Sequence, residues 1–469
     1  MEIDTIASVS TAPGVGAIAM VRVSGPSALG ILRLLAPGVA ESFEPRRATL
    51  VDLVDPDDHR VLDRAVVTFF EGPASYTGED VAEMSCHGGR LVPELVLDAC
   101  IRAGARRAEP GEFTRRAYLR GKLDLVQVEA VADLIEARSR ALHRAALDQL
   151  ERGLSARIVS LREALVGLEA YLAHHVDFPE EDDAPVSIEE IVKRAGAVVR
   201  QLDELLATAP EGELLREGAL TVLAGRPNVG KSSLYNALVG EERAIVTDEP
   251  GTTRDALEVV VQMGGFPFRL VDTAGLRESG ERIERIGIEV THRYLARADL
   301  VLLCVDAAEG MSVQEEAFLE EVGGLTGVPG KPGVPVVLVE TKADLGSDRS
   351  ESSGGDATVE ARIAGKLRVS VRTGQGLDQM RQLLPELVYS AVVAVSPDVP
   401  VLTRRRHADG LREARAGVEA FREALASGLP PEVASTHLRP AETALEEILG
   451  VISVEDVLDA VFSEFCVGK

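Results

Sequence analysis

Cysteine, basic charge and long apolar runs are all scarce in this sequence. Only four cysteines occur in 469 residues and none is spaced as CxxC, so the sequence indicates neither a disulfide framework nor a zinc site. No apolar run approaches the roughly 20 residues that cross a bilayer. The first residues, Met1-Glu-Ile-Asp4, lack the basic and apolar regions of a signal peptide. We therefore expect a cytoplasmic protein that does not bind a membrane.

Basic residues are outnumbered, 50 against 76 acidic ones, which gives a formal net charge of −26 at pH 7. Broad electrostatic binding to nucleic acid needs basic surfaces, so any contact with RNA must be local or shared with a second protein. Two places for such a contact are residues 404–407 and 115–122, where basic residues cluster. A capping or solvated role explains either cluster equally well.

The length of the chain favours about three domains. Short β-like runs dominate its beginning, which predicts a compact α+β domain over residues 1–122. Apolar residues then step by three and four over 154–172, and Ser187 with Glu190 forms a capping box. We therefore expect long helices in residues 123–217.

Strand and helix patterns alternate over residues 218–387, as a doubly wound parallel sheet requires. Helical patterns return in residues 388–469. The two helical blocks predict one discontinuous all-α domain with an α/β domain inserted in it. Two connections of the α/β domain, 323–335 and 346–356, are rich in Gly, Pro, Ser and Asp, and we expect both to be surface loops.

A phosphate-binding motif, GxxxxGKS, runs from Gly225 to Ser232 after an apolar strand. Such a loop leaves backbone N–H groups free to surround a phosphate chain at a helix N-terminus. Lys231 is placed to neutralise phosphate charge, and the Ser232 hydroxyl to ligate Mg²⁺. A glycine-rich turn that binds nothing is the alternative, but the flanking strand and helix patterns oppose it. The predicted nucleotide contacts in this loop are Asn228, Val229, Gly230, Lys231, Ser232 and Ser233.

Three further segments, each at the end of a predicted strand, favour GTP over ATP. The first contributes Asp272, which can hold Mg²⁺ through water. The second contributes Asp344, whose carboxylate can accept both donors of the guanine edge, whereas adenine offers a mismatched pattern. The predicted nucleotide contacts in these segments are Asp272, Thr273, Ala274, Gly275, Thr341, Lys342, Ala343, Asp344, Ser370, Val371 and Arg372.

These segments depart from common GTPase signatures in three places. Thr341 stands where asparagine is usual, and Val371 where alanine is usual. We expect an altered nucleotide affinity but no loss of guanine selection, because the Asp344 carboxylate remains. Leu276 stands where Ras-like proteins place the glutamine that orients water, so attack on the phosphate must be arranged otherwise.

Taken together, these motifs resemble the MnmE/TrmE family of tRNA-modification GTPases. The resemblance rests on RPNVGKSS from Arg226, TDEPGTTRD from Thr247, DTAGLRE from Asp272 and the terminal CVGK from Cys466. It covers essentially the whole chain. It implies a folate-binding and dimerising α+β domain over 1–122, a discontinuous helical domain, and an inserted P-loop GTPase domain of α/β class.

The resemblance also implies how GTP is held and cleaved. A K⁺ ion would lie beside the phosphates where other GTPases use an arginine finger. Glu284 would position the attacking water, although a solvated acid is the simpler explanation of that residue taken alone. The implied K⁺ ligands are Asn228, Thr247, Glu249 and Thr252, and the implied Mg²⁺ ligands are Ser232 and Thr253. The loop between them adds nucleotide contacts at Thr247, Asp248, Glu249, Pro250, Gly251, Thr252 and Thr253.

By the same resemblance, the N-terminal domain forms a homodimer and holds 5-formyl- or methylene-tetrahydrofolate. An arginine or lysine suits the glutamate tail of folate, and a carboxylate suits the donor edge of the pterin. The implied folate ligands are Arg22, Glu83, Lys122 and Lys469. Taken singly, the first three are explained equally well as surface charges.

Cys466 is implied to be a catalytic residue near the folate. A frayed tail with an idle thiol is one alternative. A prenylation box is another, but Gly468 is not aliphatic and Lys469 is a poor last residue for such a box.

The implied function is that of a K⁺-stimulated GTP hydrolase with an FAD-containing partner of the MnmG/GidA type, in a heterotetramer. Together they would add a carboxymethylaminomethyl or aminomethyl-type group to carbon 5 of the tRNA wobble uridine. The residues alone indicate only a GTPase with helical and α+β flanks. The alternative is a regulatory or ribosome-assembly switch of the Era/Der class, which predicts a basic RNA-binding appendage that this acidic chain lacks.

Overall fold

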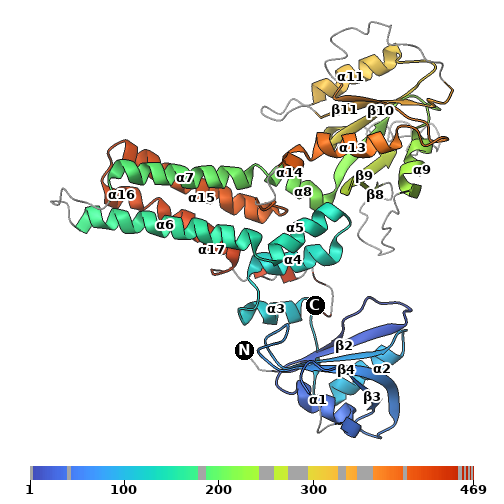
Figure 1. Cartoon of the computed structure of the whole chain (residues 1–469), viewed down its shortest axis with the longest axis vertical. Helices are drawn as coiled ribbons and strands as arrows, with labels where there is room; N and C mark the ends of the chain where they lie inside the picture. The colour runs from blue at the N-terminus through green and yellow to red at the C-terminus, as the bar shows by residue number, and fades with distance from the viewer. Residues whose placement is uncertain are drawn as a thin grey trace, which may run out of the picture. The chain divides into compact units, whose positions relative to one another are not determined.

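The computed structural model describes most of the chain, namely residues 4–39, 44–177, 186–241, 258–272, 294–325, 334–345, 363–394, 399–452, 457–458, 461–462, 465 and 468. The chain divides into two compact units (Figure 1). The first unit comprises Met1–Ala132, Gln149–Arg162 and Thr443–Lys469. The second comprises Asp133–Asp148 and Glu163–Glu442.

The first unit is built on a six-stranded sheet in the order β3-β4-β5-β2-β1-β6, in which every pair is antiparallel except β1 with β6. One face of this sheet packs on helices α1 and α2, so buried and less buried residues alternate along its strands. The elements are β1 (Ile6–Val9), β2 (Ile18–Ser24), α1 (Ala28–Leu35), a 3₁₀ turn (Pro37–Val39), β3 (Thr49–Val54), β4 (Val61–Phe70), β5 (Val81–His87), α2 (Val92–Arg102), β6 (Arg106–Arg107) and α3 (Glu112–Leu119).

The C-terminal residues pack within this first unit. Phe462 and Phe465 join an apolar cluster with residues at the start of α4 (Leu125–Glu136). The hydroxyl of Tyr118 donates to the Gly450 carbonyl at 2.5 Å. Gly468 lies against the end of β1, where an added Cβ would come within 2.9 Å of the Cα of Ser10. The end of the chain is therefore held at the N-terminal sheet.

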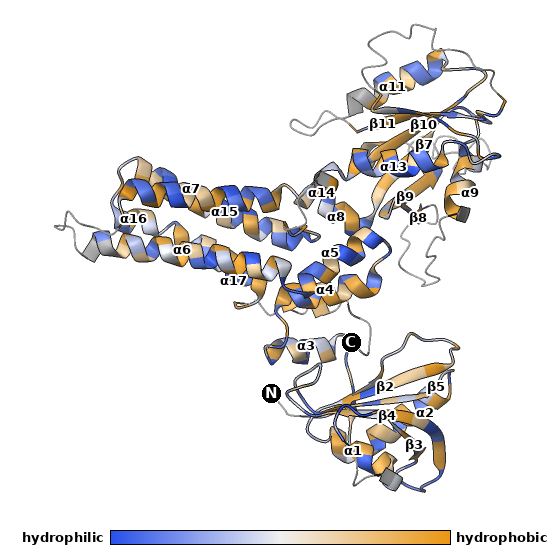
Figure 2. Ribbon diagram, viewed as in Figure 1, coloured by the Kyte–Doolittle hydropathy of each residue, from blue (hydrophilic) through white to orange (hydrophobic). Residues whose placement is uncertain are grey.

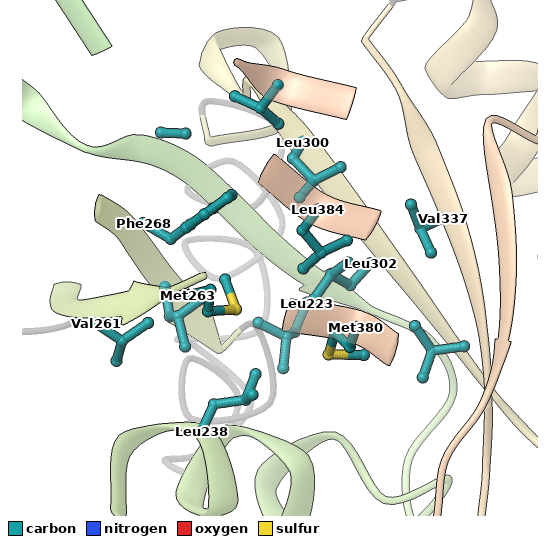
Figure 3. Close-up of a cluster of buried hydrophobic side chains, with 14 of the residues drawn as sticks. Leu223, Leu238, Val261, Met263, Phe268, Leu300, Leu302, Val337, Met380 and Leu384 are labelled. Atoms are coloured by element: carbon teal, nitrogen blue, oxygen red, sulfur yellow. The ribbon is translucent and has the colours of Figure 1, made fainter. Parts of the chain in front are cut away.

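The second unit contains the second six-stranded sheet, in the order β12-β11-β10-β7-β9-β8. All its neighbours are parallel except β8, which is antiparallel to β9. Apolar clusters cover both faces, so the central strands are continuous hydrophobic runs (Figures 2 and 3). The elements are β7 (Ala219–Ala224), α9 (Lys231–Glu241), β8 (Glu258–Met263), β9 (Phe266–Asp272), β10 (Leu300–Asp306), α11 (Val313–Leu325), β11 (Val336–Thr341), β12 (Gly365–Arg368) and α13 (Leu377–Val388).

In the sequence, helices come both before and after the strands of this sheet. α7 (Ile188–Leu206) precedes it, α15 (Arg405–Ala426) follows it, and the two helices pack against each other (Figure 1). The helical domain is therefore discontinuous, with the α/β domain inserted. The remaining helices are α5 (Arg140–Leu150), α6 (Gly153–Asp177), α8 (Ala209–Glu217), α14 (Ser390–Ala394), α16 (Pro431–Ser435) and α17 (Leu438–Leu449). None of the helices in the described part of the chain is long and apolar enough to span a membrane.

Tyr389, at the end of α13, fixes the two ends of the inserted domain together. Its side chain is fully buried, and its ring stacks on Phe266 with centroids 4.8 Å apart. Its hydroxyl donates to the Pro267 carbonyl at 2.5 Å and accepts from the Ala219 N–H at 3.2 Å. Burial raises the pKa of Tyr389, so the phenol stays neutral. The first and last elements of the α/β domain thus share one buried hydrogen-bond centre.

Most elements expected from the sequence are present, and the differences are local. Ser187 caps α7, because its hydroxyl accepts from the Glu190 N–H at 3.3 Å. The loop predicted over 323–335 is wrong at its start, since α11 continues to Leu325. Two glycines inside the last turn of α11 mimic a loop composition although the apolar spacing of that helix continues. The loop predicted over 346–356, and residues 326–333 of the first loop, lie outside the described residues.

Strand β3 and helix α1 were not predicted. β3 is an edge strand of the N-terminal sheet, and only part of each face of it is buried. Helix α1 is eight residues long, too short for a periodic pattern to stand out from its surroundings. The predicted domain boundaries, after residues 122, 217 and 387, stay a prediction.

Candidate functional site

The GxxxxGKS motif forms the turn between β7 and α9, as expected. Gly225 has φ 137°, and an added Cβ would overlap the Cys304 carbonyl of β10. Asn228 has φ 63° and Gly230 has φ 105°, both in the region that L side chains rarely adopt. The chain therefore bends sharply away from β7 and leads directly into the N-terminus of α9, the geometry in which backbone N–H groups can face an anion.

Lys231 is the first residue of α9 and is 5% exposed. Its ammonium turns back onto the loop and donates to the carbonyls of Gly225 at 2.9 Å and Arg226 at 2.7 Å. These carbonyls hold a positive charge within the phosphate-binding loop. When a nucleotide binds, the Lys231 ammonium can donate to phosphate oxygens instead of to these two carbonyls.

Ser232 and Asp272 are brought together from different elements. Ser232 lies in the first turn of α9, and Asp272 ends β9, the strand beside β7. The Ser232 hydroxyl donates to the Asp272 carboxylate at 2.9 Å. Hydroxyl and carboxylate oxygens at such a spacing are the hard donors that Mg²⁺ takes. Forty residues of sequence separate the two, and the parallel pairing of β7 with β9 joins them.

Thr341 ends β11 and is 4% exposed. Its hydroxyl contacts the Val229 carbonyl of the phosphate-binding loop and lies 2.9 Å from the Val305 carbonyl of β10. Asparagine is usual at this position, and a threonine hydroxyl can take the place of the asparagine amide. The structure gives it a definite role, because it ties the phosphate-binding loop to the neighbouring strand.

The two predicted guanine segments meet beyond the ends of β11 and β12. The Ser370 hydroxyl donates to Oδ1 of Asp344 at 2.7 Å, and Nη1 of Arg372 lies 4.0 Å from Oδ2 of the same carboxylate. Lys342 instead turns to Asp306, with Nζ 2.8 Å from Oδ2. That hydrogen bond lowers the pKa of Asp306.

Sequence reasoning missed one polar cluster at this edge, centred on Arg226. Its guanidinium donates to Glu315 at 2.9 Å and to Glu309 at 3.1 Å. Burial would raise the pKa of Glu315, but hydrogen bonds from Ser312 and the pairing with Arg226 outweigh it and lower that pKa. Ser312 and Glu315 are spaced as a capping box at the start of α11, which was the available signal.

Several predicted site residues lie outside the described part of the chain. In the GTP site they are the K⁺ and Mg²⁺ loop 247–253, Thr273, Ala274, Gly275 and the water-positioning Glu284. In the tail they are Cys466 and Lys469.

In the N-terminal sheet, Arg22 of β2 and Glu83 of β5 lie directly opposite each other. Nε and Nη2 of Arg22 lie 2.9 and 2.8 Å from Oε1 of Glu83. The guanidinium also lies near the rings of Tyr76 and Phe113, with Cζ 5.6 and 5.7 Å from their centroids. Its third nitrogen, Nη1, is buried and has no hydrogen-bond acceptor among the described residues.

The neighbouring loop connects this pair with Lys122. Tyr76 belongs to the loop between β4 and β5, and Nζ of Lys122 donates to the Pro73 carbonyl in the same loop at 3.0 Å. Arg22 and Glu83 would contact the same part of a ligand, since they are paired. The sequence predicts that a basic residue contacts the glutamate tail of the folate and that a carboxylate contacts the pterin. If Glu83 contacts the pterin, the residue at the glutamate tail must be Lys122 rather than Arg22.

The two basic clusters named from the sequence are largely neutralised within the protein. Arg404 is 7% exposed and donates to Asp133 at 2.7 Å. Arg116 pairs with Asp4 at 2.6 Å and with Glu79 at 3.1 Å. Arg120 pairs with the same Glu79 at 2.8 Å. These pairings favour the structural explanation of both clusters.

Comparison with known proteins agrees with this geometry. A family model described as "GTP-binding protein TrmE N-terminus" matches residues 5–122, and one described as "MnmE helical domain" matches residues 125–466. This chain belongs to the MnmE family. The range of the second model encloses both the phosphate-binding loop and the guanine segments.

Individual MnmE relatives match over nearly their full length. A protein from Azoarcus sp. strain BH72 is 44% identical over 469 residues, covering 99% of this chain and 98% of its own. One from Laribacter hongkongensis is 43% identical over 467 residues, and one from Heliobacterium modesticaldum 42% over 482, each covering 99% of both chains. All three are named "tRNA modification GTPase MnmE".

Proposed function

We propose that this chain hydrolyses GTP at the edge where β7, β9, β10 and β11 end, and uses that reaction in modifying the wobble uridine of tRNA. The observation that carries the proposal is the joint placement of Lys231, Ser232 and Asp272 in a chain that matches MnmE relatives from end to end. A phosphate-binding loop alone would support only nucleotide binding.

Each residue at this edge has a chemical task in the proposal. Lys231 neutralises charge that develops on the phosphates, and the backbone N–H groups from Asn228 to Ser233 hold them. Ser232 and Asp272 fit Mg²⁺, which would draw charge from the β- and γ-phosphates. Asp344 accepts the two donors of the guanine edge while Ser370 holds its carboxylate in place. Thr341 keeps the loop fixed to β10.

Cleavage needs one group that stabilises the transition state, as an arginine finger does in other GTPases, and a second that orients water in place of the absent glutamine. We assign this to K⁺ held by Asn228 and the loop 247–253, and we assign the orientation of water to Glu284. The φ of 63° at Asn228 supports the first assignment, because it turns that residue out of the regular path of the loop. Asparagine tolerates this conformation better than most residues.

We place the one-carbon chemistry at the N-terminal sheet. The N–H groups of Arg22 Nη1, which have no acceptor among the described residues, lie beside two aromatic rings and fit a ring-containing ligand that carries an acceptor, as a tetrahydrofolate does. Gly468 lies against β1, which supports the proposal that Cys466 and Lys469 serve the same site. The bound folate would supply the one-carbon unit. A homodimer and a flavoprotein partner of the MnmG/GidA type, in the cytoplasm, complete the proposal.

The test is nucleoside mass spectrometry of tRNA from cells that lack this protein. We expect the carbon-5 modification of wobble uridine to be lost and to return when the wild-type chain is supplied. A chain with Cys466→Ser should hydrolyse GTP normally but fail to restore the modification. Normal wobble uridines in the deleted strain would contradict the proposal, and restoration by the Cys466→Ser chain would remove the role of the thiol.

A further inference from the structure

We propose that an arginine pocket between α5 and the β8–β9 hairpin binds a phosphodiester of the tRNA backbone. The inference rests on the proposed function, since it assigns a place on this chain to the RNA. The pocket has a volume of about 500 Å³ and lies within the second unit. Arg140 and Arg144 line it from α5, and Arg381 lines it from α13.

The charge of these arginines is what distinguishes the pocket. Arg140 and Arg144 are exposed, and neither has a carboxylate partner anywhere in the described ranges. Arg381 donates to Asp378 at 2.6 Å. On a chain with a net charge of −26, Arg140 and Arg144 thus place two positive charges one helical turn apart at the rim of one pocket. The basic clusters at 404–407 and 115–122 contrast with them, because Arg404, Arg116 and Arg120 are paired with buried carboxylates.

The walls of the pocket are fixed. The Ala141 N–H donates to the Gly265 carbonyl at 3.0 Å, which joins the first turn of α5 to the hairpin (Figure 1). Gly264 has φ 58°, and its added Cβ would come within 2.5 Å of the Arg381 carbonyl, so the hairpin lies tightly against α13. Arg140 and Arg144 are one helical turn apart and project from one face of α5. Two arginine side chains therefore leave neighbouring turns of one helix whose backbone is fixed against the hairpin.

The donor set favours a phosphodiester over a free polyphosphate. A site for free phosphate chains surrounds its ligand with backbone N–H groups, as the turn before α9 can. Here one of the backbone N–H groups at the pocket, that of Ala141, already donates to the Gly265 carbonyl, and the charged groups that line the pocket are arginine side chains. Exposed arginine side chains at a rim are the contacts that proteins make with nucleic-acid backbones, and the planar fork of arginine matches the phosphate oxygens.

The position of the pocket separates it from the GTP site. The hairpin turn precedes Phe266 at the start of β9, whereas Asp272 ends the same strand. A strand of seven residues spans roughly 20 Å. Removing Arg140 and Arg144 should therefore leave GTP hydrolysis in the absence of RNA unchanged.

The test is fluorescence anisotropy of labelled tRNA titrated with the full chain at several salt concentrations. Arg140→Ala with Arg144→Ala should weaken binding about tenfold near 0.1 M salt and reduce the slope of log affinity against log salt by about 1 to 2. The matched control is Arg412→Ala with Arg415→Ala, which removes the same charge from arginines of α15 that pair with Asp409 and Asp203. That control should bind tRNA within about twofold of wild type.

Four outcomes would overturn the pocket assignment. Equal losses in both double variants would mean that only net charge matters. Unchanged binding in the pocket variant, or no tRNA binding by the wild-type chain, would place the RNA contact elsewhere. Displacement of tRNA by micromolar inorganic tripolyphosphate would reassign the pocket to free phosphate. None of these outcomes contradicts the proposed function as long as the wobble modification still depends on the chain. Failure of the pocket assignment can therefore be distinguished from failure of the proposed function.

Discussion

The two six-stranded sheets of this chain place their polar residues in different ways. In the mostly parallel sheet, the functional candidates lie at or just after the carboxyl ends of strands, as Asp272 ends β9 and Asp344 follows β11. In the mostly antiparallel sheet, Arg22 and Glu83 lie in the middle of strands and meet through register. A site at strand ends can be found from short motifs. A site within a sheet face depends on which residues the pairing brings opposite each other.

The largest effect should come from the parallel sheet. Lys231→Ala removes the ammonium that, among the described residues, places a positive charge inside the phosphate-binding loop. We expect GTP hydrolysis to fall by about 10² to 10³-fold, as when one preorganised stabilising group is lost. Thermal unfolding should shift little. Arg22→Met, in the other sheet, is the control and should hydrolyse GTP at the wild-type rate; a loss there would mean that the two sheets do not act separately.

The next effect concerns the antiparallel sheet. Glu83→Ala leaves the partly buried Arg22 without its carboxylate, and we expect a loss of about 2 kcal/mol in the free energy of unfolding. The double variant Arg22→Met with Glu83→Leu should recover most of that loss, because no unpaired charge remains. Denaturant unfolding of the three proteins measures this. Both variants should fail to support tRNA modification, and a fully active double variant would remove the pair from the site.

Prediction from sequence succeeded where a local pattern carries the structure. The strands of the parallel sheet are apolar runs that end in polar motifs. These runs predict strands over 220–224, 268–271, 300–305 and 336–339, close to the observed bounds of β7, β9, β10 and β11. The capping box at Ser187 also needs only four residues. The pairing of Ser232 with Asp272 follows from the parallel order of strands, which the alternating pattern already indicated.

Prediction failed where contacts join distant parts of the chain. The exact opposition of Arg22 and Glu83 spans 61 residues and depends on strand register. The engagement of Arg226 by Glu315 and Glu309 depends on where α11 begins beside the phosphate-binding loop. The arginine pocket is composed of three elements, none of which carries a motif. No periodicity in the sequence reports such juxtapositions.

A smaller effect should appear in how the free energy of unfolding depends on pH. The pKa of Glu315 is lowered in the folded state, so its contribution to stability is present above its ordinary pKa of about 4.5 and is lost as pH falls through the folded value. Glu315→Gln should therefore be about 1 to 2 kcal/mol less stable than wild type at pH 7. The difference should shrink below about pH 4.5. Denaturant unfolding at pH 7, 5 and 3.5 measures it, and a difference that grows toward low pH would contradict the ion pairing with Arg226.

The smallest expected effect is at Thr341, where the structure sharpens the comparison of the guanine segment with its usual form. Thr341→Asn restores the usual residue but loses the compact hydroxyl contact with Val229 and Val305. We expect the affinity for GDP to change by a few-fold, about 1 kcal/mol or less. Titration calorimetry with GDP measures this, with Thr341→Val as the control for loss of the hydroxyl alone. Identical affinities in all three proteins would leave the hydroxyl without a role in nucleotide binding.

The most direct test of the account is the rate of GTP hydrolysis in potassium compared with sodium, at equal ionic strength. Asn228→Gly is the informative variant, because glycine accepts the φ of 63° at this position and only the amide is lost. We predict that the wild-type chain is many-fold faster in potassium and that Asn228→Gly removes most of this difference. Equal rates in the two salts, with Asn228→Gly as fast as wild type, would contradict the proposal that a K⁺ ion held by Asn228 assists hydrolysis.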